Sequence, residues 1–267
     1  DYNNAKIHVE DRGLQFGDSI YEVVAFYNKK LIDLNFHFER LRYSLAQLHI
    51  KYNFDDKKIT KIFNKLIKIN SFKNGILYLQ ITRGVQSRNH GYKDKLKPTL
   101  IIYAKNKNFN LPNKNYQGVV VITHDDLRWS RRDIKTTNLL PNILAEKYAK
   151  RLNAYTAILI KKNRITEGVS SNIWIIKNKN ILTHVSNNDI LRGITRTVLK
   201  TIIENSEYKL KENSFTLKQL YNADEVFLTS SSNFITPILK VDNKLINKGN
   251  IGNITLSLAK SYFKTFK

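Results

Sequence analysis

The chain has 267 residues, 42% of them apolar, which is enough to bury one large core or two smaller ones. The sequence has no cysteine, which excludes disulfides and thiolate chemistry, and no apolar run approaches the length of a membrane-spanning helix. The formal net charge is +23, but the lysines are spread along the whole chain in short clusters, so the charge alone does not predict a nucleic-acid-binding protein. We expect a soluble cytoplasmic protein.

The first third of the chain mixes strand and helix patterns. A β-branched and aromatic run, a polar turn and a short apolar return predict a hairpin, and apolar residues at helical spacing predict two helices after it. Asp55 or Asp56 is the expected cap of the second helix. In chain order, the expected elements are strands over 20–26 and 31–34, helices over 36–48 and 54–69, and strands over 75–82 and 99–104.

A polar segment containing Pro112 separates this part from the rest and is the best linker candidate. We therefore predict a smaller N-terminal domain over 1–108, a linker over 109–116 and a larger C-terminal domain over 117–267. Strands and helices are mixed, and hairpin patterns are frequent. An α+β fold with mixed or antiparallel sheets and flanking helices is therefore favoured over a doubly wound one.

The second domain begins with a strand pattern and a helix pattern. In the expected helix over 139–152, one face carries four large apolar residues, namely Leu140, Ile143, Leu144 and Tyr148. The other expected elements are a strand over 118–123, three strands broken at 161–163 and 178–180, a helix over 195–204 with Val198, Leu199, Ile202 and Ile203 inward, and strands over 225–228 and 234–241.

No single short motif decides the function, and Asp11-Arg12-Gly13, for example, is typical of an ordinary turn. Five blocks in a fixed order are more specific: DRGLQFGDSIYE (11–22), HFERL (37–41), DIKTTNLLPNILAE (133–146), ITEGVSSNIW (165–174) and LRGITR (191–196). This order resembles the fold-type IV pyridoxal-phosphate enzymes, which include the branched-chain aminotransferases, the D-amino acid aminotransferases and the aminodeoxychorismate lyases. The resemblance covers nearly the whole chain.

The resemblance implies a pyridoxal 5′-phosphate cofactor and a set of residues that hold it. Lys135 matches the lysine that forms the Schiff base and then acts as general acid and base. Glu167 matches the carboxylate that keeps the pyridine nitrogen protonated. The remaining matches are Arg40, Ile194, Thr195 and Ser231 at the phosphate and Leu191 against the ring. No metal is implied.

The stretch ITRGVQSRNHGY (81–92) resembles an Arg-x-His element of the D-amino acid aminotransferases. By that resemblance Arg88 and His90 come from the neighbouring subunit of a homodimer and bind the substrate carboxylate together with Tyr21. The implied reaction is a ping-pong transamination of amino acid and 2-oxo acid substrates, in which D-alanine and 2-oxoglutarate give pyruvate and D-glutamate. The sequence departs from the family pattern at one nearby position: Ser19 replaces the glycine that is usual in FGDG.

Three alternatives remain open at this point. The same scaffold serves branched-chain L-amino acid aminotransferases, in which Arg88 and His90 have no such use, and aminodeoxychorismate lyases, which release pyruvate without a keto-acid acceptor. The third alternative is a basic nucleic-acid-binding protein on a catalytically dead scaffold. The presence of Lys135, Glu167 and Arg40 together argues against it.

Overall fold

The computed structural model describes residues 2–266, and its packing divides the chain into two compact units. Unit 1 contains the residues up to 108 together with 134–138, and unit 2 contains 109–133 and the residues from 139 onward. The chain therefore enters unit 1 a second time, for a short segment, before it returns to unit 2. Over residues 2–266, no helix combines the length and the apolar character needed to cross a membrane.

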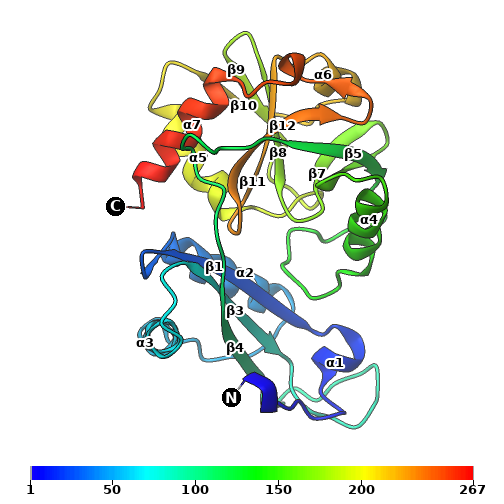
Figure 1. Cartoon of the computed structure of the whole chain (residues 1–267). Helices are drawn as coiled ribbons and strands as arrows, with labels where there is room; N and C mark the ends of the chain where they lie inside the picture. Colours follow the sequence, from blue (N-terminus) through cyan, green and yellow to red (C-terminus); the bar gives the residue numbers. More distant parts are fainter. Residues whose placement is uncertain (1, 267) are drawn as a thin grey trace. The chain divides into compact units, whose positions relative to one another are not determined.

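Unit 1 is built on an antiparallel sheet with the strand order β2-β1-β3-β4 (Figure 1). The long β1–β3 ladder places Ser19 opposite Thr82 and Tyr21 opposite Gln80. In chain order, the elements are η1 (Tyr2–Asn4), α1 (Arg12–Phe16), β1 (Ser19–Tyr27), β2 (Lys30–Leu31), α2 (Leu34–Gln47), α3 (Asp56–Ile69), β3 (Gly75–Thr82) and β4 (Thr99–Asn106).

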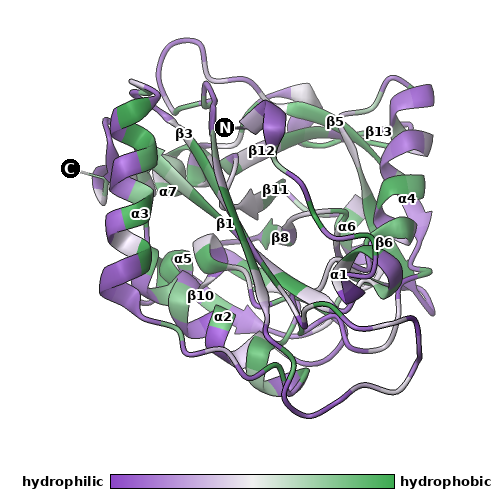
Figure 2. Cartoon of the chain, turned by 90° about the horizontal axis from the view of Figure 1, so that it is seen from below, coloured by the Kyte–Doolittle hydropathy of each residue, from purple (hydrophilic) through white to green (hydrophobic). Residues whose placement is uncertain are grey.

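The core of unit 1 lies on one face of this sheet. Side chains alternate along a strand, so Ile20, Val24 and Phe26 of β1 are buried while Tyr21 is only half-buried. Helices α2 and α3 supply the other half of the core, and Figure 2 shows hydrophobic and hydrophilic residues alternating along α3 as expected for an amphipathic helix. Asp55 caps α3 as predicted, accepting a 3.0 Å hydrogen bond from the backbone N–H of Lys58.

Unit 2 is built on a mixed sheet with the strand order β10-β9-β8-β11-β12-β5-β6-β7, to which β13 adds beside β12. The pairs β9–β10, β5–β12 and β5–β6 are parallel, and the remaining ladders are antiparallel. In chain order, the elements are β5 (Val119–Asp125), α4 (Leu140–Arg151), β6 (Thr156–Lys161), β7 (Arg164–Gly168), β8 (Asn172–Lys177), β9 (Asn180–Thr183), α5 (Ile194–Glu204), β10 (Lys209–Glu212), α6 (Leu217–Tyr221), β11 (Glu225–Ser230), β12 (Phe234–Val241), β13 (Lys244–Leu245), η2 (Asn247–Gly249) and α7 (Asn253–Lys264).

Both units combine sheets with flanking helices, so the expected α+β class is confirmed. One expectation is corrected: Asp11-Arg12-Gly13 is not an isolated turn but the start of α1. The Asp11 carboxylate caps that helix by accepting a 2.8 Å hydrogen bond from the N–H of Gly13. In α5, Leu199 and Ile203 are buried as predicted, whereas Val198 and Ile202 are half-buried.

The large apolar residues of α4 share one face, but that face is exposed. Leu140 is 66% exposed, Ile143 59% and Leu144 56%. The helix instead turns its small residues, Ala145 and Ala149, inward, where they pack in a cluster with β5 and β6. Small side chains allow the helix axis to approach the sheet closely, which leaves the bulky side chains on the outer face.

Candidate active site

Lys135 lies in the short segment that returns to unit 1, directly beside β1. Its backbone carbonyl accepts a 3.0 Å hydrogen bond from the N–H of Tyr21, and its own N–H donates to the Ser44 hydroxyl at 3.3 Å. The half-buried Lys135 side chain places Nζ 4.2 Å from the centroid of the Tyr21 ring. Two of the predicted site residues, Lys135 and Tyr21, are therefore brought together within one unit.

Ser19 is part of the hydrogen-bond network that fixes this segment. Its hydroxyl lies 2.6 Å from the Thr137 hydroxyl and accepts a 3.0 Å hydrogen bond from the side-chain amide of Gln80. A bridge between Ile20 and Thr136 continues the sheet pattern into the segment. A glycine at position 19 lacks this hydroxyl, so in this chain the departure from FGDG ties the residues around Lys135 to β1.

Arg40 lies in α2 and is buried rather than on a solvated face. Its guanidinium donates to both carboxylate oxygens of Glu22 at 2.7 Å, and His37 Nδ1 lies 2.7 Å from the same carboxylate. Burial raises the pKa of Glu22, but Arg40 and His37 together lower it well below its usual range. Burial also lowers the pKa of His37, so we assign a neutral ring that donates to Glu22.

Arg88 and His90 are exposed and lie in the loop that joins β3 to β4. Both side chains contact Phe16 of α1: the Arg88 Cζ atom lies 4.7 Å from its ring centroid, and the His90 ring lies 5.5 Å away. The two residues that the sequence pairs by an Arg-x-His spacing therefore share one aromatic neighbour.

Glu167 lies at the end of β7 in unit 2 and is 4% exposed. Its Oε2 accepts hydrogen bonds from the backbone N–H of Leu191 at 3.0 Å and from the side-chain amide of Asn172 at 3.1 Å, and its Oε1 accepts one from Arg128. Asn172 Nδ2 also donates to the Leu191 carbonyl at 2.9 Å. The structure therefore brings the predicted pair Glu167 and Leu191 together.

Arg128 and Asp126 are functional candidates that sequence reasoning did not assign. Arg128 bridges Glu167 and Asp126, donating to Asp126 at 2.7 Å and 2.9 Å. Burial raises the pKa of Glu167 even though Arg128 opposes the shift, and the two carboxylates raise the pKa of Arg128 despite its burial. The sequence signal that points to Arg128 is the scarcity of arginine in a lysine-rich chain. An arginine kept in such a chain indicates a site that needs its bidentate fork, which lysine cannot supply.

The N-terminus of α5 carries the predicted phosphate-binding residues Ile194 and Thr195. Gly193 is the N-cap residue and makes no side-chain cap hydrogen bond, and the Thr195 hydroxyl lies 3.4 Å from that of Tyr262. A Cβ added at Gly193 would lie 2.1 Å from Oδ1 of Asn172, so a larger residue here would force the Asn172 side chain to shift. Ser231 lies half-buried in the turn between β11 and β12.

Comparison with known proteins assigns the family. Residues 19–241 match the family described as amino-transferase class IV. Over 266 residues the chain is 40% identical to the D-alanine aminotransferase of Staphylococcus haemolyticus, covering 99% of this chain and 94% of that protein. The chain belongs to the class IV aminotransferases.

Solved structures agree with this class IV fold. The branched-chain amino acid aminotransferase of Escherichia coli has a TM-score of 0.90 at 21% identity, covering 100% of this chain and 91% of that one. The branched-chain aminotransferase of the archaeon Thermoproteus uzoniensis, solved with norvaline, has a TM-score of 0.87 at 24% identity, covering 99% and 90%. At these identities the likeness establishes the fold.

This class IV aminotransferase is therefore an enzyme that depends on pyridoxal 5′-phosphate, as its class does. Its residues fit that cofactor. Lys135 offers a primary amine held at Tyr21, and Glu167 offers a buried carboxylate held by three donors. Because Gly193 supplies no side-chain cap, the first turn of α5 suits an anion such as a phosphate.

Proposed function

We propose that this chain transaminates D-amino acids, with D-alanine as donor and 2-oxoglutarate as acceptor, giving pyruvate and D-glutamate. The exposed pair Arg88 and His90, both resting on Phe16, is the observation that carries the choice of substrate. An arginine fork and an imidazole beside it suit a carboxylate. The 40% identity to a protein named D-alanine aminotransferase supports the same choice.

The catalytic roles follow from the groups that each residue presents. When bound, pyridoxal phosphate supplies an aldehyde that condenses with amines and a ring that accepts electrons. Lys135 would hold the cofactor through its Nζ, and the same amine would serve as the base that accepts the proton of the substrate α-carbon. The Tyr21 ring, 4.2 Å from Nζ, fixes that amine.

Glu167 is the residue that we assign to the ring nitrogen. Arg128, Asn172 and Leu191 fix its carboxylate, which would favour the protonated form of that nitrogen in the bound cofactor. In this proposal unit 2 supplies Glu167 and the first turn of α5, whereas Lys135 and Arg40 belong to unit 1.

The other predicted residues are assigned to the phosphate and to the ring face of the cofactor. The phosphate would be bound by Arg40, Ile194, Thr195 and Ser231. Leu191, whose backbone already holds Glu167, would pack against the ring.

The choice of enantiomer depends on where the substrate carboxylate is fixed. In the proposed site Arg88 and His90 bind the carboxylate together with the hydroxyl of Tyr21. With the carboxylate fixed on one side, only one enantiomer points its α-hydrogen at Lys135. Both half-reactions use the same site, because the second substrate also carries a carboxylate next to its reacting carbon.

We further propose that the enzyme is a homodimer in which Arg88 and His90 serve the active site of the partner. The exposed apolar face of α4 supports an association of two copies, because a contiguous group of large apolar side chains usually marks an interface. We place the enzyme in the cytoplasm, where free amino acids and 2-oxo acids are available as substrates.

The first experiment uses purified protein reconstituted with pyridoxal phosphate. D-alanine and L-leucine are added separately without a keto acid, and the visible absorbance of the bound cofactor is recorded. Loss of that absorbance with D-alanine alone supports the proposal, and loss with L-leucine alone replaces it with a branched-chain aminotransferase. A response to neither substrate contradicts D-alanine transamination and directs the search to a lyase, which is then tested with aminodeoxychorismate. Borohydride reduction and peptide mapping should place the cofactor on Lys135.

A further inference from the structure

The loop between β3 and β4, residues 83–98, is exposed along most of its length and carries Arg88 and His90. Loops of this length without secondary structure are mobile unless other groups hold them. A mobile loop would present its arginine and histidine in many orientations, which weakens the binding of a carboxylate. The contacts that restrain this loop therefore bear directly on the proposed site.

Arg12, the first residue of α1, restrains the loop at its tip. The guanidinium is buried and donates to the backbone carbonyls of three consecutive residues: Asn89 at 2.6 Å, His90 at 3.1 Å and Gly91 at 3.4 Å. Its Nε donates to the Asp18 carboxylate at 2.9 Å. One side chain thus holds the backbone of His90 and of its neighbours on both sides.

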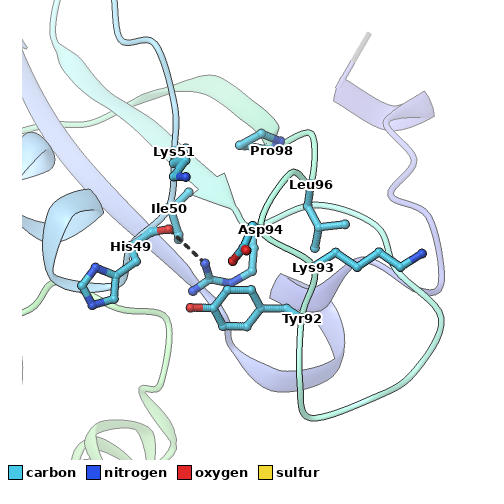
Figure 3. Close-up of a pocket in the computed structure, with 9 residues that line it drawn as sticks. His49, Ile50, Lys51, Tyr92, Lys93, Asp94, Leu96 and Pro98 are labelled. Atoms are coloured by element: carbon cyan, nitrogen blue, oxygen red, sulfur yellow. Dashed lines mark hydrogen bonds between the residues drawn. The ribbon is translucent and has the colours of Figure 1, made fainter.

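Arg83 restrains the same loop at its base. It donates to both oxygens of Asp18 at 2.7 Å and 2.9 Å and to the carbonyls of Leu48 and His49 at 2.7 Å and 3.2 Å. The ring of Tyr92, which Figure 3 labels, lies against its guanidinium, with 3.8 Å between the Arg83 Cζ atom and the ring centroid. The carboxylate of Asp18 is therefore shared by the base and the tip of the loop.

Phe16, one helical turn after Arg12, supports the two functional side chains directly. Its ring lies 4.7 Å from the Arg88 Cζ atom and 5.5 Å from the His90 ring. Helix α1 thus contacts the backbone of the loop through its first residue and the side chains of the loop through its last.

We propose that α1 is the element that positions Arg88 and His90 for the substrate carboxylate, with Arg12 as the main positioning residue and Phe16 as the second. This inference rests on the proposed function, in which Arg88 and His90 bind that carboxylate. A guanidinium is required at position 12 because its planar fork serves three carbonyls and a carboxylate at once, whereas an ammonium is a compact point charge. The role is in substrate affinity, since neither residue is assigned to the cofactor.

The experiment compares four variants of the holoenzyme: Arg12→Lys, Phe16→Leu, Arg88→Gln and, as a matched control, Arg42→Lys. Arg42 also pairs with a carboxylate, that of Asp56, but its side chain is 47% exposed and far from the loop in sequence. Cofactor binding, kcat and KM for D-alanine, and the Kd of propionate, a carboxylate that cannot react, are measured for each. We expect Arg12→Lys to raise KM and the propionate Kd about 10- to 100-fold, with kcat changed less than about threefold.

The outcomes separate this inference from the proposed function. If Arg88→Gln raises KM while Arg12→Lys and Phe16→Leu match the control, α1 does not position the loop and the inference is wrong, although the proposed site stands. If Arg88→Gln leaves KM unchanged, the loop is not the carboxylate site. Both the proposed substrate site and the inference about α1 are then wrong. If Arg12→Lys loses its cofactor, Phe16→Leu decides: a raised KM with cofactor retained supports the inference, and an unchanged KM overturns it.

Discussion

The guanidinium of Arg40 is locked onto the carboxylate of Glu22 by two hydrogen bonds of 2.7 Å. Both side chains are buried on the helix-covered face of the unit 1 sheet. The pair holds the arginine in one orientation, which is what a residue proposed to bind a phosphate requires. Its rigidity therefore comes from an acidic residue on β1, eighteen positions earlier in the chain.

Replacing Glu22 should cost stability as well as function. Glu22→Gln leaves the Arg40 charge buried without its partner, and breaking a buried ion pair in this way costs about 3–5 kcal/mol. We expect the free energy of unfolding, measured by urea titration, to fall by that amount. The control is Glu39→Gln, an exposed position on α2, which should change it by less than about 0.5 kcal/mol. Equal effects in the two variants would show that the pair has no special role.

His37 should make the protein sensitive to acid. Because burial lowers its pKa in the folded state below the usual 6.5, the unfolded chain takes up the proton first as the pH falls. Acidification below pH 6.5 therefore lowers the free energy of unfolding. In thermal unfolding, lowering the pH from about 7.5 to about 5.5 should reduce the stability of His37→Gln less than that of the wild type. The control His8→Gln, at an exposed position, should respond as the wild type does. Parallel curves for His37→Gln and the wild type would contradict the assignment.

Arg128 should affect the chemical step more than substrate binding. Arg128→Lys keeps a positive charge near Glu167 but cannot bridge it to Asp126 in the same way, so the carboxylate loses its fixed position. We expect kcat to fall about 10- to 100-fold with KM for D-alanine nearly unchanged. Arg131→Lys, in the same stretch but paired with Asp133 at a half-exposed position, is the matched control. A KM effect without a kcat effect would contradict the role.

The exposed apolar face of α4 is predicted to form part of the homodimer interface. Ile143 is 59% exposed, and Ile143→Glu places a charge in the centre of the apolar group. If this face joins two copies, the dimer dissociation constant from analytical ultracentrifugation should rise at least about tenfold, because burying an unpaired charge costs several kcal/mol. Lys147→Glu, an exposed charged position on the same helix, should have a smaller effect. An unchanged dissociation constant for Ile143→Glu would remove α4 from the interface.

Periodicity predicted the long elements because a strand or helix of eight or more residues repeats its pattern several times. The helix that became α3, its Asp55 cap and the strands β3 and β12 are confirmed to within a few residues. Helix α1 was missed because five residues contain little more than one turn, so no period is visible. The sequence pattern also did not show which face of α4 is buried. The two alanines face the sheet, because small side chains allow a closer helix–sheet contact than large ones do.

The candidate site was predictable as a set of residues but not as a set of contacts. Ordered blocks identify Lys135 and Glu167 by resemblance, and the structure then supplies their neighbours. Arg128 is 39 residues from Glu167 in the chain, and Arg12 is 78 residues from His90. Sheet pairing and the path of the loops bring such partners together. No local sequence pattern predicts these contacts, because the residues are far apart in the chain.

The return of residues 134–138 to unit 1 has a consequence for how the chain is made. Ile134 belongs to the hydrophobic core of unit 1, and Thr136 bridges to Ile20. During synthesis the first 108 residues leave the ribosome before the segment that completes their core, and much of the start of unit 2 emerges in between. A fragment that stops at residue 108 therefore lacks both a part of its core and Lys135, the proposed Schiff-base lysine. Neither unit is one continuous stretch of chain. Residues 134–138 complete the core of unit 1 and also carry the proposed site residue Lys135.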